Sequence, residues 1–333
     1  METGESKSLL SPLTFTLKIS VIIPVKNRAK LLHLTLENIR HQSLQPYEII
    51  VVDDGSSDNL TELIQTYHSS VIFTKSEGVG PGAARNTGLR LASGDLIQFF
   101  DSDDLMTSNK LQVQSNLLIS KNADFVYGPW VKAIYDAGKW KQVDVIMQYS
   151  AMPNGRLADH VLGGWCNITQ SVLFRKDLIV EAGPWREDLM PHEDYEFWFR
   201  IAKLAKNYHH ENDSCVIYRQ HQNQITDMHV SDEGKWIDGL KARDIIEKGI
   251  DFKSAWSSRL MFKASLAASR FHFVKKFGVR PEVKLTRTDW FFRYVYEVKR
   301  KYGQLQTGTS WQKMHGVLHR HPEVFENYVR QLT

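Results

Sequence analysis

Hydrophobic positions in the first third of the chain alternate between short apolar runs and segments of helical spacing. The apolar runs, rich in β-branched residues, predict buried strands over 19–23, 48–52, 71–73 and 96–100. The segments between them predict helices over 31–39, 60–67 and 83–92. Strands that alternate with helices at this interval indicate βαβ units, so we predict an α/β fold with a mostly parallel central sheet and flanking helices.

The same alternation continues less regularly up to about residue 228. It predicts further helices over 109–120 and 176–182 and from Pro191 onward, strands over 125–127, 169–174 and 214–219, and a hairpin over 130–145. Beyond residue 229 the pattern changes, because apolar residues recur every three to four positions over 252–274 and again over 290–298. We therefore divide the chain into a leader (1–17), an α/β domain (18–228) and a C-terminal helical extension (229–333).

Charge is distributed unevenly along the chain, which carries a net charge of +4. Residues 251–333 contain 16 Lys and Arg against 6 Asp and Glu, whereas the remainder contains 26 against 32. A basic tail on an acidic body suggests an anionic partner, such as a membrane surface. The alternative is that these helices simply pack on the main domain and expose a solvated basic face.

Composition adds little beyond a location. The hydrophobic fraction of 42% and the charged fraction of 24% are ordinary for a soluble protein. Two cysteines, Cys166 and Cys215, make neither a disulfide framework nor a metal-ligand spacing. The N-terminus has no secretory signal pattern, and no apolar run reaches the length of about 18 residues that a membrane span needs. We expect a cytoplasmic protein, or one peripheral to the inner face of the membrane.

Carboxylates follow two of the predicted strands directly. Asp53 and Asp54 come after the second strand, and Asp101 and Asp103 come after the fourth. An unpaired buried charge is costly, so these acids must emerge at the carboxyl edge of the sheet, where open α/β sheets bind ligands. Asp101 and Asp103 can share a hard divalent cation, which prefers carboxylate and phosphate oxygens. The alternative is a cluster of helix N-caps.

Three more polar residues lie where elements are predicted to begin or end. Glu193 and Asp194 begin the helix after Pro191, where they are either caps or a general base for an acceptor hydroxyl. His221 follows the strand over 214–219 and could complete a metal site, bind phosphate or lie on the surface. The dinucleotide-binding and P-loop glycine motifs are both missing from the sequence, which argues against those two folds.

Six segments of this sequence resemble, in order, those of one enzyme family. They are Ser20–Asn27, Val51–Asp58, Gly82–Gly88, Asp101–Asp104, His192–Glu196 and Tyr218–His221. Together they resemble the family 2 nucleotide-sugar glycosyltransferases, whose Rossmann-like fold is called GT-A. The resemblance covers roughly residues 18–226 and leaves the helical extension without an assigned role.

The resemblance implies roles for the matching positions. The donor nucleotide-sugar is expected to contact Pro24, Val25, Asp53, Asp54, Arg85, Asp101 and Ser102. Asp103 and His221 are the implied ligands of Mn²⁺ or Mg²⁺. Asp194 is the implied catalytic base, with Glu193 as the second choice.

The implied reaction is metal-dependent, inverting transfer of a sugar from a nucleotide-sugar, expected to be a UDP-sugar, to a glycan, lipid-linked or other hydroxyl acceptor. The sequence contains no Gln-x-x-Arg-Trp motif, so we expect single additions rather than processive synthesis. We expect no nucleic-acid partner and leave homo-oligomerisation open. The main alternative is a non-catalytic nucleotide-sugar-binding or scaffold protein of the same fold. A nucleotidyltransferase is disfavoured, because residues 24–28 lack the glycines that its phosphate-binding loop needs.

Overall fold

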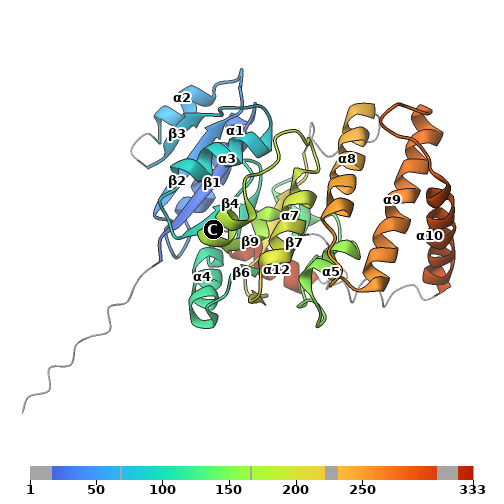
Figure 1. Ribbon diagram of the computed structural model, residues 1–333. Coiled ribbons are helices and arrows are strands. Elements are labelled where there is room, and N and C mark those ends of the chain that lie inside the picture. The colour runs from blue at the N-terminus through green and yellow to red at the C-terminus, as the bar shows by residue number, and fades with distance from the viewer. Residues whose placement is uncertain (1–16, 68–69, 166, 222–231, 306–321, 333) are drawn as a thin grey trace, which may run out of the picture.

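The computed structural model describes residues 17–67, 70–165, 167–221, 232–305 and 322–332 (Figure 1). The predicted leader lies outside these residues except for Leu17. The predicted boundary between residues 228 and 229 falls in one of the gaps, and this division of the chain stays a prediction.

A seven-stranded sheet forms the centre of the molecule, in the order β10-β6-β9-β4-β1-β2-β3. Its strands are β1 (Ile19–Val25), β2 (Glu48–Asp53), β3 (Ile72–Lys75), β4 (Leu96–Phe99), β6 (Phe125–Tyr127), β9 (Val172–Arg175) and β10 (Tyr208–His210). Strand β9 runs antiparallel to both of its neighbours, and the other pairs are parallel. The predicted α/β fold with a mostly parallel sheet is confirmed.

Helices cover both faces of this sheet. One face carries α1 (Ala29–Arg40), α2 (Leu60–Gln65) and α4 (Lys110–Lys121). The other carries α3 (Pro81–Leu91), α5 (Leu157–Leu162), α6 (Lys176–Ala182) and α7 (Glu193–Leu204). Alternate residues of β1 enter the two cores, with Val21 and Ile23 on one side and Ile22 on the other. Because both faces are buried, the strand reads as a continuous apolar run in the sequence.

Strand β1 extends two residues further than the sequence predicts. The prediction ends it before Pro24, because proline has no backbone N–H to donate within a sheet. In the structure β1 pairs with β4 only as far as Ile22, whereas its pairing with β2 continues to Val25. The end of β1 therefore has a strand neighbour on one side only, and it accommodates Pro24.

A second, four-stranded sheet has the order β5-β11-β7-β8. Its strands are β5 (Leu105–Met106), β7 (Trp130–Asp136), β8 (Lys139–Gln142) and β11 (Val216–Arg219). The predicted hairpin is present, and positive φ angles at Ala137 and Gly138 make its tight turn. The predicted strand over 214–219 is present as β11, and it belongs to this small sheet. The prediction also missed β5, β10 and α5, which are too short to show a periodicity.

The C-terminal helices divide into two groups. Helices α8 (Glu233–Gly249), α9 (Trp256–Phe277) and α10 (Arg287–Leu305) stack side by side outward from α7 (Figure 1). The hydrophobic core on the sheet face covered by α3, α5, α6 and α7 extends into α8 and α9, which contribute Leu240, Phe262 and Phe273. Helix α12 (Pro322–Arg330) returns to the α/β body, where Phe325 and Tyr328 pack on the small sheet. No helix in the described ranges is both long and apolar enough to cross a membrane.

Candidate active site

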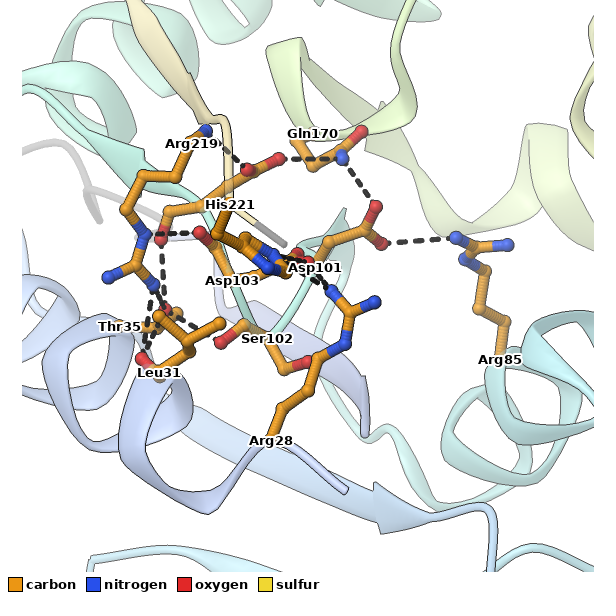
Figure 2. Close-up of polar contacts among 11 residues, drawn as sticks. Arg28, Leu31, Thr35, Arg85, Asp101, Ser102, Asp103, Gln170, Arg219 and His221 are labelled. Carbon is orange, nitrogen blue, oxygen red and sulfur yellow. Dashed lines mark hydrogen bonds and ion pairs between the residues drawn. The ribbon is translucent and has the colours of Figure 1, made fainter. Parts of the chain in front are cut away.

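Three carboxylates converge in the loop that connects β4 to β5. Asp101, Asp103 and Asp104 each place one oxygen within 4.8 Å of the others. Figure 2 shows Asp101 and Asp103 of this loop. Asp103 and Asp104 are buried, and Asp101 is half-buried. Carboxylate oxygens are the ligands that Mg²⁺ and similar hard cations prefer. The loop therefore offers a donor set that fits a divalent cation.

The backbone of this acidic loop is held from both sides. From α1, the hydroxyl of Thr35 lies 3.0 Å from the carbonyl oxygen of Ser102 and 2.9 Å from that of Asp104. From β11, the guanidinium of Arg219 donates to the carbonyl of Asp103 and, over 2.8 Å, to the hydroxyl of Thr35. The carboxylates thus project from a rigid backbone rather than from a freely moving loop.

Gln170, just before β9, connects two of the acids. Its side-chain nitrogen donates to Asp101 Oδ2 over 2.5 Å and to Asp104 Oδ2 over 2.9 Å. Burial, together with the negative charge of Asp101, raises the pKa of Asp104 to about 8. A proton retained on Asp104 lessens the repulsion within the cluster at neutral pH.

Asp103 is the meeting point of two further side chains. Its carboxylate forms an ion pair with Arg28, which lies in the loop between β1 and α1. His221, just beyond β11, places Nε2 3.0 Å from Asp103 Oδ2 and 3.3 Å from Arg28 Nη1. The two residues that the resemblance implies as metal ligands, Asp103 and His221, therefore lie in contact.

Arg85 on α3 links the acidic loop to the start of α7. Its buried guanidinium donates to Asp101 Oδ1 over 3.1 Å and to Glu193 Oε1 over 3.0 Å. It also lies over the ring of Trp185, 4.7 Å from the ring centroid. The sequence assigned Arg85 to the donor nucleotide or diphosphate, and the structure places it between these two carboxylates.

Glu193 and Asp194 differ in their surroundings. Burial raises the pKa of Glu193 to about 7, although the charge of Arg85 opposes the shift. The other oxygen of Glu193, Oε2, is buried and has no hydrogen-bond partner among the described residues. Asp194 is half-buried and accepts from the backbone N–H of Tyr195 over 2.7 Å. Burial raises the pKa of Asp194 as well.

A pocket of about 330 Å³ lies at the carboxyl ends of β2 and β3, which β1 separates from β4 and the acidic loop. It is lined by Lys26, Asp53, Asp54, Gly55, Ser56, Lys75, Ser76, Gly78 and Val79. Asp53 accepts from the backbone N–H of Ser56 over 2.7 Å, and Asp54 accepts from that of Gly80 over 2.8 Å. These two acids therefore hold the loops that form the pocket.

Besides Arg85, three of the predicted donor contacts are buried and do not line this pocket. Pro24 and Val25 are buried at the end of β1, opposite Val52 and Asp53 of β2, and neither lines the pocket. Ser102 is also buried, and its carbonyl faces Thr35. The structure thus gathers Arg85, Asp101, Asp103, Glu193 and His221 in one cluster, with Asp53 and Asp54 in the pocket at the ends of β2 and β3.

Sequence reasoning missed three residues of the cluster. Arg28 follows the first strand, and a cation at the carboxyl edge of the sheet was a usable signal. Arg219 lies in one of the matching segments but received no role. Gln170 carries no signal, because an isolated polar residue before a strand is common.

A larger cavity of about 530 Å³, between α12 and the loop before β11, contains none of the predicted site residues.

The α/β sheet with an acid cluster at its carboxyl edge defines a protein of the GT-A fold class. Residues 20–179 match the model of a family described as glycosyl transferase family 2. An uncharacterized glycosyltransferase from Haemophilus influenzae is 30% identical over 205 residues, which cover 60% of this chain and 78% of that protein. The chain belongs to the family 2 glycosyltransferases, as the ordered segments of the sequence predicted.

Other comparisons extend this placement. The Escherichia coli UDP-Glc:alpha-D-GlcNAc-diphosphoundecaprenol beta-1,3-glucosyltransferase WfgD is 35% identical over 112 residues, 33% of this chain and 44% of that protein. The chain spans less than a third of the length of three rickettsial relatives that it also matches. Residues 1–349 of Staphylococcus aureus TarS, solved in complex with UDP-GlcNAc, share the fold, with a TM-score of 0.56 and 16% identity over 95% of this chain and 82% of that fragment.

Proposed function

We propose that the protein is a metal-dependent, inverting glycosyltransferase that moves a sugar from a UDP-sugar to a hydroxyl of a glycan or lipid-linked acceptor, one addition at a time. The observation that carries the proposal is the buried bridge made by Arg85. It joins Asp101 of the acidic loop to Glu193 of the Glu193–Asp194 pair. The candidate cation site and Glu193, the neighbour of the proposed base Asp194, therefore belong to one network.

The donor is proposed to lie along the carboxyl edge of the sheet. Its nucleoside would occupy the pocket beside Asp53 and Asp54, and its diphosphate would extend toward Asp101 and Asp103. WfgD is named for UDP-glucose, and TarS was solved with UDP-GlcNAc, which supports a UDP-sugar here. The name of WfgD also supports a lipid-linked diphosphate acceptor.

Asp103 and His221 are the proposed ligands of Mn²⁺ or Mg²⁺, with an oxygen of Asp101 close by. When bound, the cation supplies positive charge that offsets the charge on the departing nucleoside diphosphate. Asp104 is proposed to stabilise the loop, because its carboxylate accepts hydrogen bonds from the side chain of Gln170 and from the backbone N–H of Arg219. These roles use every acid of the loop.

Asp194 is the proposed base. A base must reach the acceptor hydroxyl, and Asp194 is the more exposed of the pair, whereas Glu193 is buried against Arg85. Asp194 would take the proton as the acceptor oxygen attacks the anomeric carbon from the side opposite the diphosphate. A single displacement of this kind inverts the configuration at that carbon.

The test is a transfer assay with a panel of UDP-sugars and a synthetic N-acetylglucosaminyl diphospholipid as acceptor, with and without EDTA. We expect EDTA to abolish transfer and Mn²⁺ or Mg²⁺ to restore it. Asp103→Ala should stay inactive after cation is added back. Full turnover in EDTA would overturn the metal role. UDP-sugar binding without transfer to any acceptor would favour the non-catalytic alternative.

We also propose that the protein works at the inner face of a membrane, with α10 in contact with anionic lipid. Trp290, Phe291 and Tyr294 project from α10 with exposed fractions of 63%, 60% and 70%. The two acids of α10 are already paired, Asp289 with Arg270 and Glu297 with Arg300. Exposed aromatic rings on a basic helix are typical of surfaces that lie in the lipid headgroup region.

A further inference from the structure

Arg28 occupies the position where the proposed cation and the donor diphosphate would meet. Its guanidinium pairs with Asp103 and lies 3.3 Å from Nε2 of His221 (Figure 2). These are the same two side chains that are proposed to hold the divalent cation. The side chains of Arg28 and Asp103 are only 17% and 12% exposed, so water screens this ion pair weakly.

The backbone of Arg28 is anchored on the nucleoside side of the site. The neighbouring N–H of Asn27 donates to the hydroxyl of Ser56 over 2.9 Å. The N–H of Ala29 donates to Asp58 Oδ2 over 2.8 Å. Ser56 lines the pocket beside Asp53 and Asp54. Asn27, next to Arg28, is therefore hydrogen-bonded to a residue of the pocket lining, and the side chain of Arg28 reaches Asp103 of the acidic loop.

Two cations cannot share Asp103 without repulsion. A guanidinium and a divalent cation would each seek the same carboxylate oxygen in a site with little solvent, where like charges repel strongly. A guanidinium displaced from Asp103 needs another anion. The planar fork of arginine is well matched to phosphate oxygens, to which it donates two parallel hydrogen bonds.

We propose that Arg28 competes with the divalent cation for Asp103 and His221, and that it turns to the donor diphosphate when the cation binds. The inference rests on the proposed function, because it takes the cation site and the diphosphate position from there. In the absence of donor, Arg28 weakens cation binding. When donor and cation are both bound, Arg28 contacts the donor diphosphate. Cation and UDP-sugar would then bind more tightly together than either does alone.

The first experiment measures Mn²⁺ affinity by calorimetry in the absence of any nucleotide. Arg28→Met should bind Mn²⁺ about tenfold more tightly than the unaltered protein, since a charge-assisted contact competing for Asp103 is lost. Lys30→Met is the matched control, because Lys30 is an exposed cation at the start of α1. It should leave the Mn²⁺ affinity nearly unchanged. Arg28→Lys, which keeps the charge on a different head group, should fall in between.

The second experiment measures UDP affinity at saturating Mn²⁺. Here Arg28→Met should bind about tenfold more weakly than the unaltered protein, because one charge-assisted contact to the diphosphate is missing. Opposite changes in the two affinities are the signature of the proposal. A variant that merely disturbs the fold would weaken both.

Equal or weaker Mn²⁺ binding by Arg28→Met, with Mn²⁺ binding still lost in Asp103→Ala, would overturn the competition and leave the cation site standing. Mn²⁺ binding that survives Asp103→Ala, or no Mn²⁺ binding by any form, would overturn the cation site itself and this inference with it. Unchanged UDP affinity in Arg28→Met would overturn the diphosphate contact.

Discussion

The charge state of single residues in this site depends on burial and on the charged side chains next to them. Burial raises the pKa of Glu193 to about 7, and Arg85 opposes the shift. Burial raises the pKa of Asp104 to about 8, and the negative charge of Asp101 adds to this effect. A carboxylate that is buried beside another acid keeps its proton to a higher pH, whereas one beside a guanidinium loses it earlier. The chemistry of the site therefore changes near neutral pH.

The pH dependence of transfer should report the Glu193–Asp194 pair. Burial raises the pKa of Asp194, so the proposed base keeps its proton to a higher pH than an exposed aspartate does, and kcat/KM should rise with pH through an apparent pKa above the ordinary value of an aspartate. Arg85→Met removes a charge that lowers the pKa of both Glu193 and Asp194. Its profile should shift to higher pH. A pH–rate profile that shifts to lower pH, or one without an acid limb, would contradict this account.

The division of labour between the two acids gives a second test. Asp194→Asn should lower kcat by about 10²–10⁴-fold, the usual loss when a general base is removed, while UDP affinity stays nearly constant. Glu193→Gln should instead weaken the network around Arg85 and affect both quantities moderately. If Glu193→Gln shows the larger loss of kcat and Asp194→Asn retains full transfer, Glu193 is the base.

Among the described elements, α10 exposes three large aromatic side chains, Trp290, Phe291 and Tyr294. Trp290 also packs edge-on against Phe271 of α9, so part of its ring is covered within the fold. The central strands differ from α10, because the apolar runs of β1, β2 and β4 are buried on both sides. The hydrophobic pattern of the sequence alone therefore located these three strands.

Co-sedimentation with vesicles tests the proposed surface of α10. The protein should bind vesicles that contain phosphatidylglycerol and release them at high salt, since screening weakens the basic attraction. The double variant Trp290→Ala/Phe291→Ala should bind less. Phe252→Ala is the matched control, because Phe252 is 85% exposed but lies outside α10.

Two results would contradict the lipid contact. One is vesicle binding that is equal in the α10 variant and the Phe252 control. The other is a protein that ignores anionic vesicles but dimerises in solution, with dimerisation lost in the α10 double variant. The second result would assign the α10 surface to another copy of the chain.

At the scale of the whole molecule, the C-terminal segment is part of the α/β body. Phe325 and Tyr328 of α12 enter the core of the small sheet, and the Tyr328 hydroxyl donates to the carbonyl of Asn212 over 2.8 Å. The backbone carbonyl of Gln331 accepts from the N–H of Ser108, a few residues after the acidic loop. Helix α12 therefore supports the sheet on which His221 is positioned.

Phe325→Ala should destabilise the protein by about 3–5 kcal/mol, as expected for removal of a buried phenyl ring. Chemical denaturation would measure the free energy of unfolding. Glu326→Ala, at the neighbouring exposed position, should change it by no more than about 0.5 kcal/mol. A loss for Phe325→Ala as small as that of the control would show that α12 contributes little to the core.

The sequence by itself determined the main strands, the order of the elements and the edge at which Asp53, Asp101 and Asp103 emerge. These features are local, since an apolar run predicts a buried strand and the acids that follow it mark the end of that strand. The family was predicted from short motifs, whose order along the chain can be read from the sequence alone. Pro24 is the exception, because its place within β1 depends on which neighbouring strand ends first.

Only the tertiary structure decided which side chains meet. The contacts of Arg28 with Asp103, of Gln170 with Asp101 and of Arg85 with Glu193 join residues that are 75, 69 and 108 positions apart in the sequence, and no periodicity encodes them. The return of α12 to the small sheet is of the same kind. Such contacts arise from the packing of complete elements, whereas local pattern reflects only the burial of each element by itself.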